Sequence, residues 1–271
     1  VYSTVDKCEF INNRAENKGS EIYFLCKESS VGTSKSPFLI QNSKFKLTEE
    51  RTSVIIYLEW IQSSDFAFKD NEVIIRKDNS NFLFGSEGDL TKGGITISNN
   101  CISPSKTHLC DPSNTALYNK VESGFPNICE DTEPTQPPSE EPTPPPSEEP
   151  ITCPNKPSGT VDDLKEKPTS YTTNSILYGC QLQISNRINA NQHVVHIYHC
   201  TFEGLQGSST NNGGAIYIML TSKGPNEKES YIEHCTFINC QSNKGGAIYI
   251  DTAQPTRFFS ITNCKFENNK A

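Results

Sequence analysis

The stretch Gly245-Gly246-Ala247-Ile248-Tyr249-Ile250 decides the predicted fold, because the same six residues occur 32 positions earlier, from Gly213. A glycine pair permits a sharp corner, and the alternating apolar and aromatic residues that follow are typical of a short strand. A looser copy, Gly19-Ser20-Glu21-Ile22-Tyr23-Phe24, lies near the start of the chain. The motif positions in these copies are Gly19, Gly213, Gly214, Ile216, Gly245, Gly246 and Ile248.

A second motif, Cys-x-Phe, alternates with the first. It recurs at spacings of 35 and 29 residues in the second half, and a copy begins at Cys8. The Cys and Phe are two positions apart and point to the same side of a strand, which we expect to face inward. A period of about 30 residues made only of strand and turn signals predicts a β-solenoid, whose equivalent side chains form ladders. The motif residues, with the Asn that follows two copies, are Cys8, Phe10, Asn13, Cys200, Phe202, Cys235, Phe237, Cys264, Phe266 and Asn269.

Composition divides the chain in three. Ten of the 17 prolines lie between Pro134 and Pro157, and the whole net charge of −8 comes from residues 121–155, which hold no Lys or Arg. Such a segment is typical of an extended linker, and we expect proteases to cut it first. We predict a solenoid end at residues 1–125, a linker at 126–157 and the start of a second solenoid at 158–271. A single solenoid interrupted by one long loop is the alternative.

Composition also excludes several classes of protein. The sequence pI near 5.2 argues against nucleic-acid binding, and no apolar run approaches the roughly 20 residues of a membrane-spanning helix. Eleven cysteines without a CxxC pair favour an oxidising compartment, so we expect an extracellular or cell-surface location. The chain opens on a strand-like pattern without a secretory signal, which predicts an internal piece of a longer protein. The only helix candidate is Val161 to Lys167, before Pro168.

Histidines and the remaining cysteines are candidate sites. His199 and His234 each precede a motif cysteine and would stack on one face, which makes them weak zinc candidates, but no further ligands complete a site. Other cysteines flank the linker or bracket a loop and are candidates for disulfides, whose pairing the sequence leaves open. These disulfide candidates are Cys101, Cys110, Cys129 and Cys153.

Gly-Gly-Ala-Ile at 213–216 and 245–248, with Phe-x-x-Asn at Phe10 and Phe266, resembles the repeats of chlamydial polymorphic outer membrane proteins and of related protist surface proteins. The resemblance covers residues 1–24 and 195–271. Gly19-Ser20 lacks the second glycine, and the copies at Phe202 and Phe237 lack the Asn. The resemblance implies an all-β fold, a right-handed parallel β-helix displayed on a cell surface, with adhesion as its role.

We therefore expect a non-catalytic adhesion or ligand-display stalk without a cofactor. Its partner would be a host or neighbouring-cell ligand, protein or glycan, contacted by the loops Ser208 to Asn212 and Ser222 to Glu229. One alternative is a carbohydrate-active enzyme of the pectate-lyase or polygalacturonase type, which needs carboxylates that recur on one face. The nearest charged clusters are Asp162-Asp163 and Arg76-Lys77-Asp78. A purely structural spacer is the other alternative.

Overall fold

The computed structural model describes most of the strand-forming part of the chain. The described residues are 3–15, 22–25, 38–48, 55–59, 65–75, 82–87, 94–104, 109–111, 113, 115–129, 152–165, 171–207, 212–219, 229–251 and 258–271. Within these ranges the chain forms strands β1 to β24 and one helix, α1. The strands pair in parallel, so the protein belongs to the all-β class with parallel sheets, as the sequence predicted.

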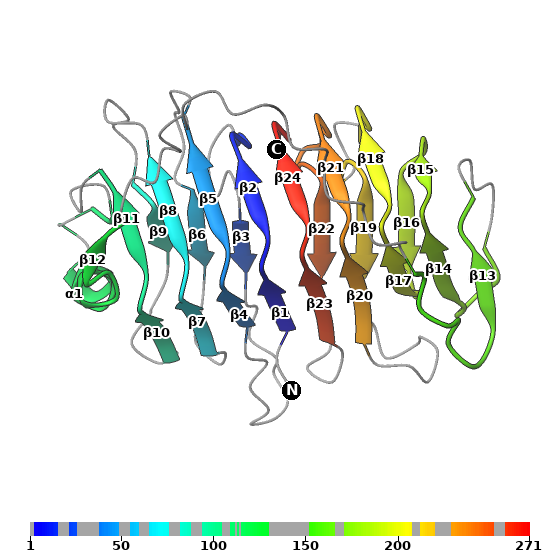
Figure 1. Ribbon diagram of the computed structural model, residues 1–271, viewed down its shortest axis with the longest axis horizontal. Coiled ribbons are helices and arrows are strands. Elements are labelled where there is room, and N and C mark those ends of the chain that lie inside the picture. Colours follow the sequence, from blue (N-terminus) through cyan, green and yellow to red (C-terminus); the bar gives the residue numbers. More distant parts are fainter. Residues whose placement is uncertain are drawn as a thin grey trace, which may run out of the picture.

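Two nine-stranded sheets, here called sheets I and II, run the length of the molecule (Figure 1). In eight repeats a strand of sheet I is followed, after a short turn, by a strand of sheet II, and one terminal strand of each sheet has no such partner. The order in sheet I is β10 (Gly94–Ser98), β7 (Asp65–Lys69), β4 (Phe38–Gln41), β1 (Ser3–Asp6), β23 (Phe258–Thr262), β20 (Glu229–Glu233), β17 (Val194–Tyr198), β14 (Ile176–Cys180) and β13 (Val161–Asp163). The order in sheet II is β12 (Asn127–Ile128), β11 (Cys101–Ser103), β8 (Glu72–Ile75), β5 (Lys44–Leu47), β2 (Glu9–Ile11), β24 (Lys265–Glu267), β21 (Thr236–Ile238), β18 (Thr201–Glu203) and β15 (Gln183–Ile184).

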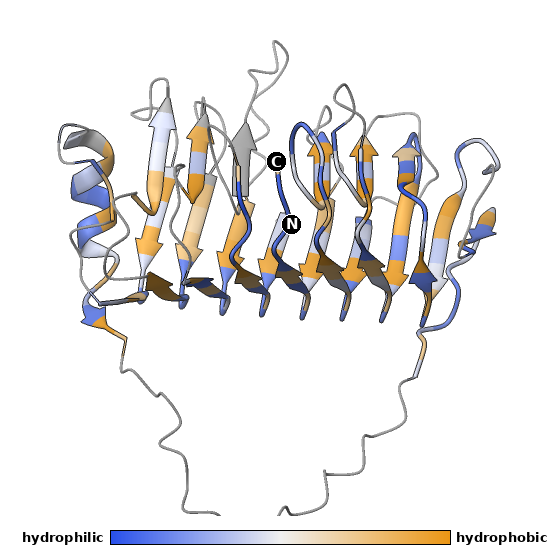
Figure 2. Ribbon diagram, turned by 90° about the horizontal axis from the view of Figure 1, so that it is seen from above, coloured by the Kyte–Doolittle hydropathy of each residue, from blue (hydrophilic) through white to orange (hydrophobic). Residues whose placement is uncertain are grey.

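A third strand follows in six of these repeats, and these strands form two smaller sheets of three strands each. Sheet IIIa consists of β16 (Ile188–Asn191), β19 (Ile216–Met219) and β22 (Ile248–Asp251). Sheet IIIb consists of β3 (Ile22–Leu25), β6 (Ile56–Glu59) and β9 (Phe84–Glu87). Apolar residues recur at equivalent positions of neighbouring strands along the whole row, which places the core between the sheets (Figure 2).

The order of the strands differs from their order in the chain. β1 pairs with β23, and β2 pairs with β24, so strands from residues 1–125 and from 158–271 share sheets I and II. The blue start and the red end of the chain therefore lie side by side in the middle of the row (Figure 1). The middle of the sequence supplies both ends of the row, β12 with α1 at one and β13 at the other. Most of the predicted linker, residues 130–151, lies outside the described residues.

Helix α1 (Thr115–Ser123) covers one end of the row. Its buried residues Leu117 and Val121, together with Phe125 after the helix, recur every four positions and form an apolar face. The short helix lies among polar residues, and for that reason the sequence analysis missed it. The helix predicted from Val161 is wrong at its start, because residues 161–163 form β13 and pair with β14.

The turns between sheets I and II share a left-handed residue. Its backbone φ lies between 50° and 57° in each turn, a conformation that Asn and Asp tolerate better than other L-residues. The side chain of the residue that follows the left-handed residue points inward. The left-handed residues of these turns are Lys7, Asn42, Asp70, Asn99, Gln181, His199, His234 and Asn263.

Candidate functional site

The four predicted repeat phenylalanines and Phe45 form one continuous stack inside the molecule. Neighbouring rings from Phe202 through Phe237 and Phe266 to Phe10 and Phe45 lie 4.7–5.0 Å apart at interplanar angles of 6–8°. The step from Phe266 to Phe10 joins the end of the chain to its start, with a ring separation of 5.0 Å. The repeats at the two ends of the chain therefore stack on each other in the core as neighbouring repeats do.

The motif cysteines form a second inward column beside this stack. Each backbone amide donates to the side chain of the next repeat: Cys200 N to Cys235 Sγ at 3.5 Å, and Cys235 N to Cys264 Sγ at 3.4 Å. In the first half the column continues with polar side chains, because Cys8 N donates to Ser43 Oγ at 3.1 Å. The predicted inward position of these four cysteines agrees with their burial.

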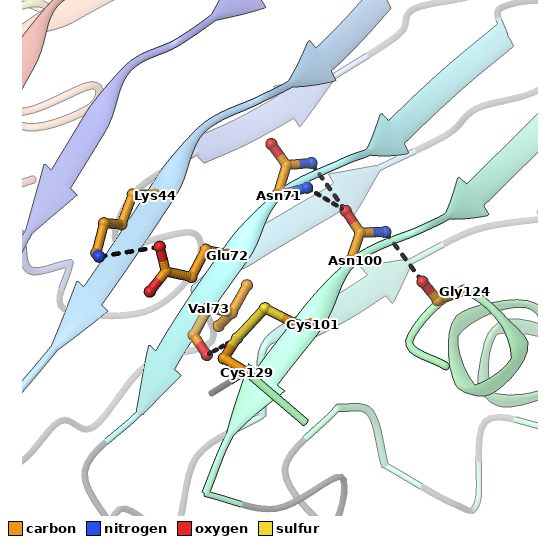
Figure 3. The surroundings of a disulfide bond; sticks show 8 residues. All are labelled: Lys44, Asn71, Glu72, Val73, Asn100, Cys101, Gly124 and Cys129. Carbon is orange, nitrogen blue, oxygen red and sulfur yellow. Dashed lines mark hydrogen bonds and ion pairs between the residues drawn. A yellow bond between two sulfur atoms is a disulfide. The ribbon is translucent and has the colours of Figure 1, made fainter. Parts of the chain in front are cut away.

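Asparagine residues occupy the same column position in the repeats toward the α1 end of the row. Ser43 N donates to Asn71 Oδ1 at 2.9 Å, and Asn71 N donates to Asn100 Oδ1 at 2.9 Å. Asn100 Nδ2 donates in turn to the carbonyl of Gly124, which ties the column to the segment after α1 (Figure 3). Sequence reasoning missed Asn71 and Asn100, although each follows a left-handed turn residue just as Cys8 does.

The asparagines of the Phe-x-x-Asn motif form a similar column at the next turn. Asn269 Oδ1 accepts from Cys240 N at 2.8 Å, and Asn13 Oδ1 accepts from Asn269 N at 2.9 Å. Asn269 Nδ2 also donates to the carbonyl of Phe237 at 3.0 Å. Cys240 occupies the Asn position of its own repeat, where its buried thiol makes weak contacts with the carbonyls of Phe202 and Ile238 at 3.7 and 3.5 Å.

The glycine pairs lie where the backbones of adjacent repeats are in close contact. Gly213 and Gly245 have φ of 72° and 63°, which favours glycine. A Cβ on Gly214 would collide with the carbonyl oxygen of Gly246, so the second glycine is required by close backbone contact. Gly19, the looser copy, lies outside the described residues.

Three of the free thiols are poor nucleophiles in the folded chain. Burial raises the pKa of Cys110 to about 11, and burial likewise raises the pKa of Cys240 to about 11. Burial also raises the pKa of Cys264. Since the thiolate is the reactive form, these cysteines act as small apolar residues. All the free cysteines among the described residues are buried, and they are Cys8, Cys110, Cys200, Cys235, Cys240 and Cys264.

Two disulfides hold the ends of the row. Cys101 pairs with Cys129, which binds β11 to β12, next to the Asn column and the Lys44–Glu72 ion pair (Figure 3). Cys153 pairs with Cys180, which binds the segment before β13 to β14. Three of the four disulfide candidates therefore form bonds, and Cys180 is a partner that sequence reasoning missed. The expectation for Cys110 is wrong, because its buried thiol is free and donates to the carbonyl of Asp111 at 3.6 Å.

His199 and His234 stack as the coil period predicted. Their ring centroids are 4.6 Å apart with an interplanar angle of 9°. Imidazole lone pairs lie in the ring plane, so two parallel rings direct them side by side and not toward one ion. The part of the chain that the structure describes contains no group of three or more potential ligands for a metal ion.

Sheet II carries an outward row of alternating charge. The variable residue of the Cys-x-Phe motif faces outward, and Glu9 pairs in register with Lys265 on one side and Lys44 on the other. Lys44 in turn binds Glu72 at 2.9 Å. Cross-strand pairs of opposite charge support sheet pairing by about 0.2–1 kcal/mol each. The motif's variable position is thus a stabilising surface position.

The carboxylates considered for catalysis have local structural partners. Asp162 accepts hydrogen bonds from Thr172 and from Ser175 Oγ, and the Ser175 bond, followed by the Thr172 bonds, lowers the pKa of Asp162. Asp163 forms an ion pair with Lys156 at 2.6 Å. These contacts fix the end segment before β14. Arg76-Lys77-Asp78 lies outside the described residues, as do Ser208 to Asn211 and Ser222 to Lys228 of the predicted binding loops.

Comparison with known proteins gives no relative from which a function can be transferred. No protein-family model, curated protein or solved structure matches the chain. Among the described residues, the helix is too short to cross a membrane. Two disulfides are consistent with an oxidising, extracellular environment.

Proposed function

We propose that the chain is a non-catalytic surface protein built on a right-handed parallel β-helix, and that it displays variable loops for adhesion to a host or neighbouring cell. The sheet order supports the fold, because eight described repeats add one strand to sheet I and one to sheet II, and six of them add one to a third face. The resemblance of the Gly-Gly-Ala-Ile and Phe-x-x-Asn motifs to surface-protein repeats supports the location. The ligand would be a protein or a glycan.

The observation that carries the proposal is the unbroken phenylalanine stack through five repeats, from Phe202 to Phe45. The strands keep their register, while the spacing of the motifs varies by several residues. Variation in length is therefore confined to the segments between strands. A rigid scaffold with variable connections is the arrangement that extended binding proteins of this class use.

The test compares cell binding by the chain with binding by a variant in which residues 208–211 and 222–228 are replaced with short Gly/Ser turns. Adhesion predicts that the chain binds cells or a glycan array saturably and that the variant loses at least about tenfold in affinity, equivalent to 1.4 kcal/mol. A circular dichroism spectrum unchanged from that of the parent would show that the variant is folded. Equal binding by both proteins, or none by either, would favour the structural spacer, and reducing-sugar release from a glycan panel would favour the enzyme.

A further inference from the structure

Four buried free thiols lie in a line through adjacent repeats, here called the thiol column. Strands β18, β21, β24 and β2 each begin at the residue after one of these cysteines and pair residue by residue, which brings the cysteines into register. β24 and β2 lie side by side although they come from opposite ends of the chain (Figure 1). The column therefore crosses from residues 152–271 into residues 3–129, and its members in order are Cys200, Cys235, Cys264 and Cys8.

Neighbouring positions in the thiol column have the separation that a disulfide requires. Adjacent strands lie about 4.8 Å apart, and the Cα atoms of a disulfide lie about 4.4–6.8 Å apart. The molecule already uses this spacing, because the Cys101–Cys129 disulfide joins β11 to the residue after β12, its neighbour in sheet II, at a Cα–Cα distance of 4.8 Å. The repeat spacing is therefore compatible with a disulfide between adjacent members of the column.

The thiols also point along the column toward the neighbouring repeat. Cys8 Sγ donates to the carbonyl of Ile261 at 3.5 Å, and Ile261 belongs to β23 in the repeat of Cys264. Burial, and then hydrogen bonding with the thiols of Cys235 and Cys8, raise the pKa of Cys264. The thiol of Cys264 therefore lies between two others that it contacts.

The two ends of the thiol column restrict how its members can pair. The register continues with Ser43 beyond one end and with Leu182 beyond the other, and neither residue has a thiol. Each terminal cysteine, Cys8 or Cys200, therefore has a single thiol neighbour within the column. All four thiols can form disulfides between neighbours in one way only, which pairs Cys200 with Cys235 and Cys264 with Cys8.

We propose that the thiol column is an oxidation site, at which Cys8 and Cys264 form a disulfide that joins residues 3–129 covalently to residues 152–271. The register of β2 with β24 and of β1 with β23 places this pair on the boundary between the two pieces. In the oxidised chain, a protease cut in the predicted linker leaves the pieces covalently attached. In the reduced chain only the shared sheets hold them together.

The reaction needs an oxidant, which is a small disulfide such as oxidised glutathione. One thiol of the pair loses its proton and attacks a sulfur of the oxidant, which forms a mixed disulfide and releases one molecule of reduced thiol. The second cysteine loses its proton, attacks the protein sulfur of the mixed disulfide and releases the other molecule. The protein loses two electrons and two protons, and the oxidant takes them up. Since Cys8 and Cys264 are 2% and 3% exposed, the exchange proceeds when the contact between β2 and β24 opens locally.

The test uses the whole chain with a protease recognition sequence placed between residues 132 and 150, incubated with oxidised glutathione in the absence of denaturant. After the free thiols are blocked and the linker is cut, the products are separated by denaturing, non-reducing electrophoresis. Neither disulfide already formed joins the two fragments, so a single band that a reductant splits in two reports a new bond. We expect two bands before oxidation and the single band after it, and peptide mass mapping should identify Cys8 linked to Cys264.

Serine variants, each checked for folding by circular dichroism, test the pairing. Cys8→Ser introduces the residue type that the next repeat has at this position and should lose the cross-link. Cys110→Ser removes a buried free thiol of the same piece outside the thiol column and should keep it. Cys200→Ser should lower the yield, because the unpaired Cys235 then competes for Cys264. Two fragments at every ratio of oxidised to reduced glutathione, or a cross-link that survives in Cys8→Ser or maps to other cysteines, would overturn the proposal.

Discussion

Asn71 is a buried residue whose side chain joins three repeats. Its Oδ1 accepts from Ser43 N at 2.9 Å, and its Nδ2 donates to the Ile40 carbonyl at 3.2 Å and to Asn100 Oδ1 at 3.0 Å. The substitution Asn71→Ala leaves the buried amide of Ser43 without this acceptor and removes both hydrogen bonds that Asn71 Nδ2 donates. We expect a loss of about 2–4 kcal/mol in the free energy of unfolding, measured by urea denaturation.

The neighbouring residue provides the control. Asp70 is exposed and left-handed, and Asp70→Asn keeps a side chain that tolerates this conformation, so stability should change by less than about 0.5 kcal/mol. Equal losses in Asn71→Ala and Asp70→Asn would mean that the turn backbone, and not the Asn column, supplies the stability.

His199 gives a pH prediction at the same scale. Partial burial, and then the charge of His234, lower the pKa of His199 from its ordinary 6.5. The unfolded chain therefore takes up this proton first as pH falls, so stability is complete above about pH 6.5 and declines as pH falls toward the lowered pKa. The variant His199→Asn keeps the left-handed turn and should lose less Tm than the parent between about pH 7.5 and about pH 5. An identical loss in both proteins would contradict the assignment.

Sequence reasoning found the inward residues that carry a motif and missed those that do not. Cys8 and Phe10 were predictable because Cys-x-Phe repeats, and two residues on one side of a strand share a face. Asn71 and Asn100 perform the role of Cys8 with a different side chain, so identity of residue type could not reveal them. Cys180 was missed for another reason: its disulfide partner Cys153 meets it only through the pairing of β13 with β14.

At the scale of the element, the turn between β1 and β2 contains an unfavourable residue. Lys7 has φ of 52°, in the region that costs most L-residues about 1–2 kcal/mol, and its neighbours in the column, Asn42 and Asn263, are of the type that tolerates it. The substitution Lys7→Asn should raise the free energy of unfolding by about 0.5–1 kcal/mol. Thermal melting checks this.

A strand lysine is the matched control for this turn. Lys46 lies within β5, outside the left-handed positions, so Lys46→Asn removes the same charge without relieving strain. It should leave stability equal or lower, because Asn is a poor strand residue. A similar gain in both variants would attribute the effect of Lys7→Asn to charge.

At the scale of the whole molecule, the order of the strands is the feature that the sequence did not reveal. Sequence repeats predict that the repeats stack in a row. They do not predict that the first and last repeats of the chain lie at the ends of that row. Here the disulfides and α1 cap β12 and β13, which come from the middle of the chain, and the caps leave Phe266 and Phe10 to stack on each other. The end strands of a row of stacked repeats need protection, so the location of the caps determines which repeats lie inside.

This arrangement predicts that the two pieces stay together when the chain is cut. Neither disulfide crosses between residues 3–129 and 152–271, and the contact between the pieces includes the β1–β23 and β2–β24 pairs and the Phe10–Phe266 and Asn13–Asn269 contacts. A protease recognition sequence placed between Thr132 and Pro150 allows the cut to be made at will. After cleavage under reducing conditions, the pieces should co-elute in size-exclusion chromatography and appear as one complex in native mass spectrometry.

Two phenylalanines of the same stack separate association from general stability. Phe10→Ala removes a ring at the contact between the pieces, whereas Phe45→Ala removes one inside residues 1–125, and each should cost the intact chain about 3–5 kcal/mol. After cleavage Phe10→Ala should dissociate at a higher protein concentration than Phe45→Ala, because only its lost ring stacks on Phe266 of the other piece. Separate elution of the cleaved pieces of the unmodified chain would contradict the shared sheets and would favour two independent solenoids.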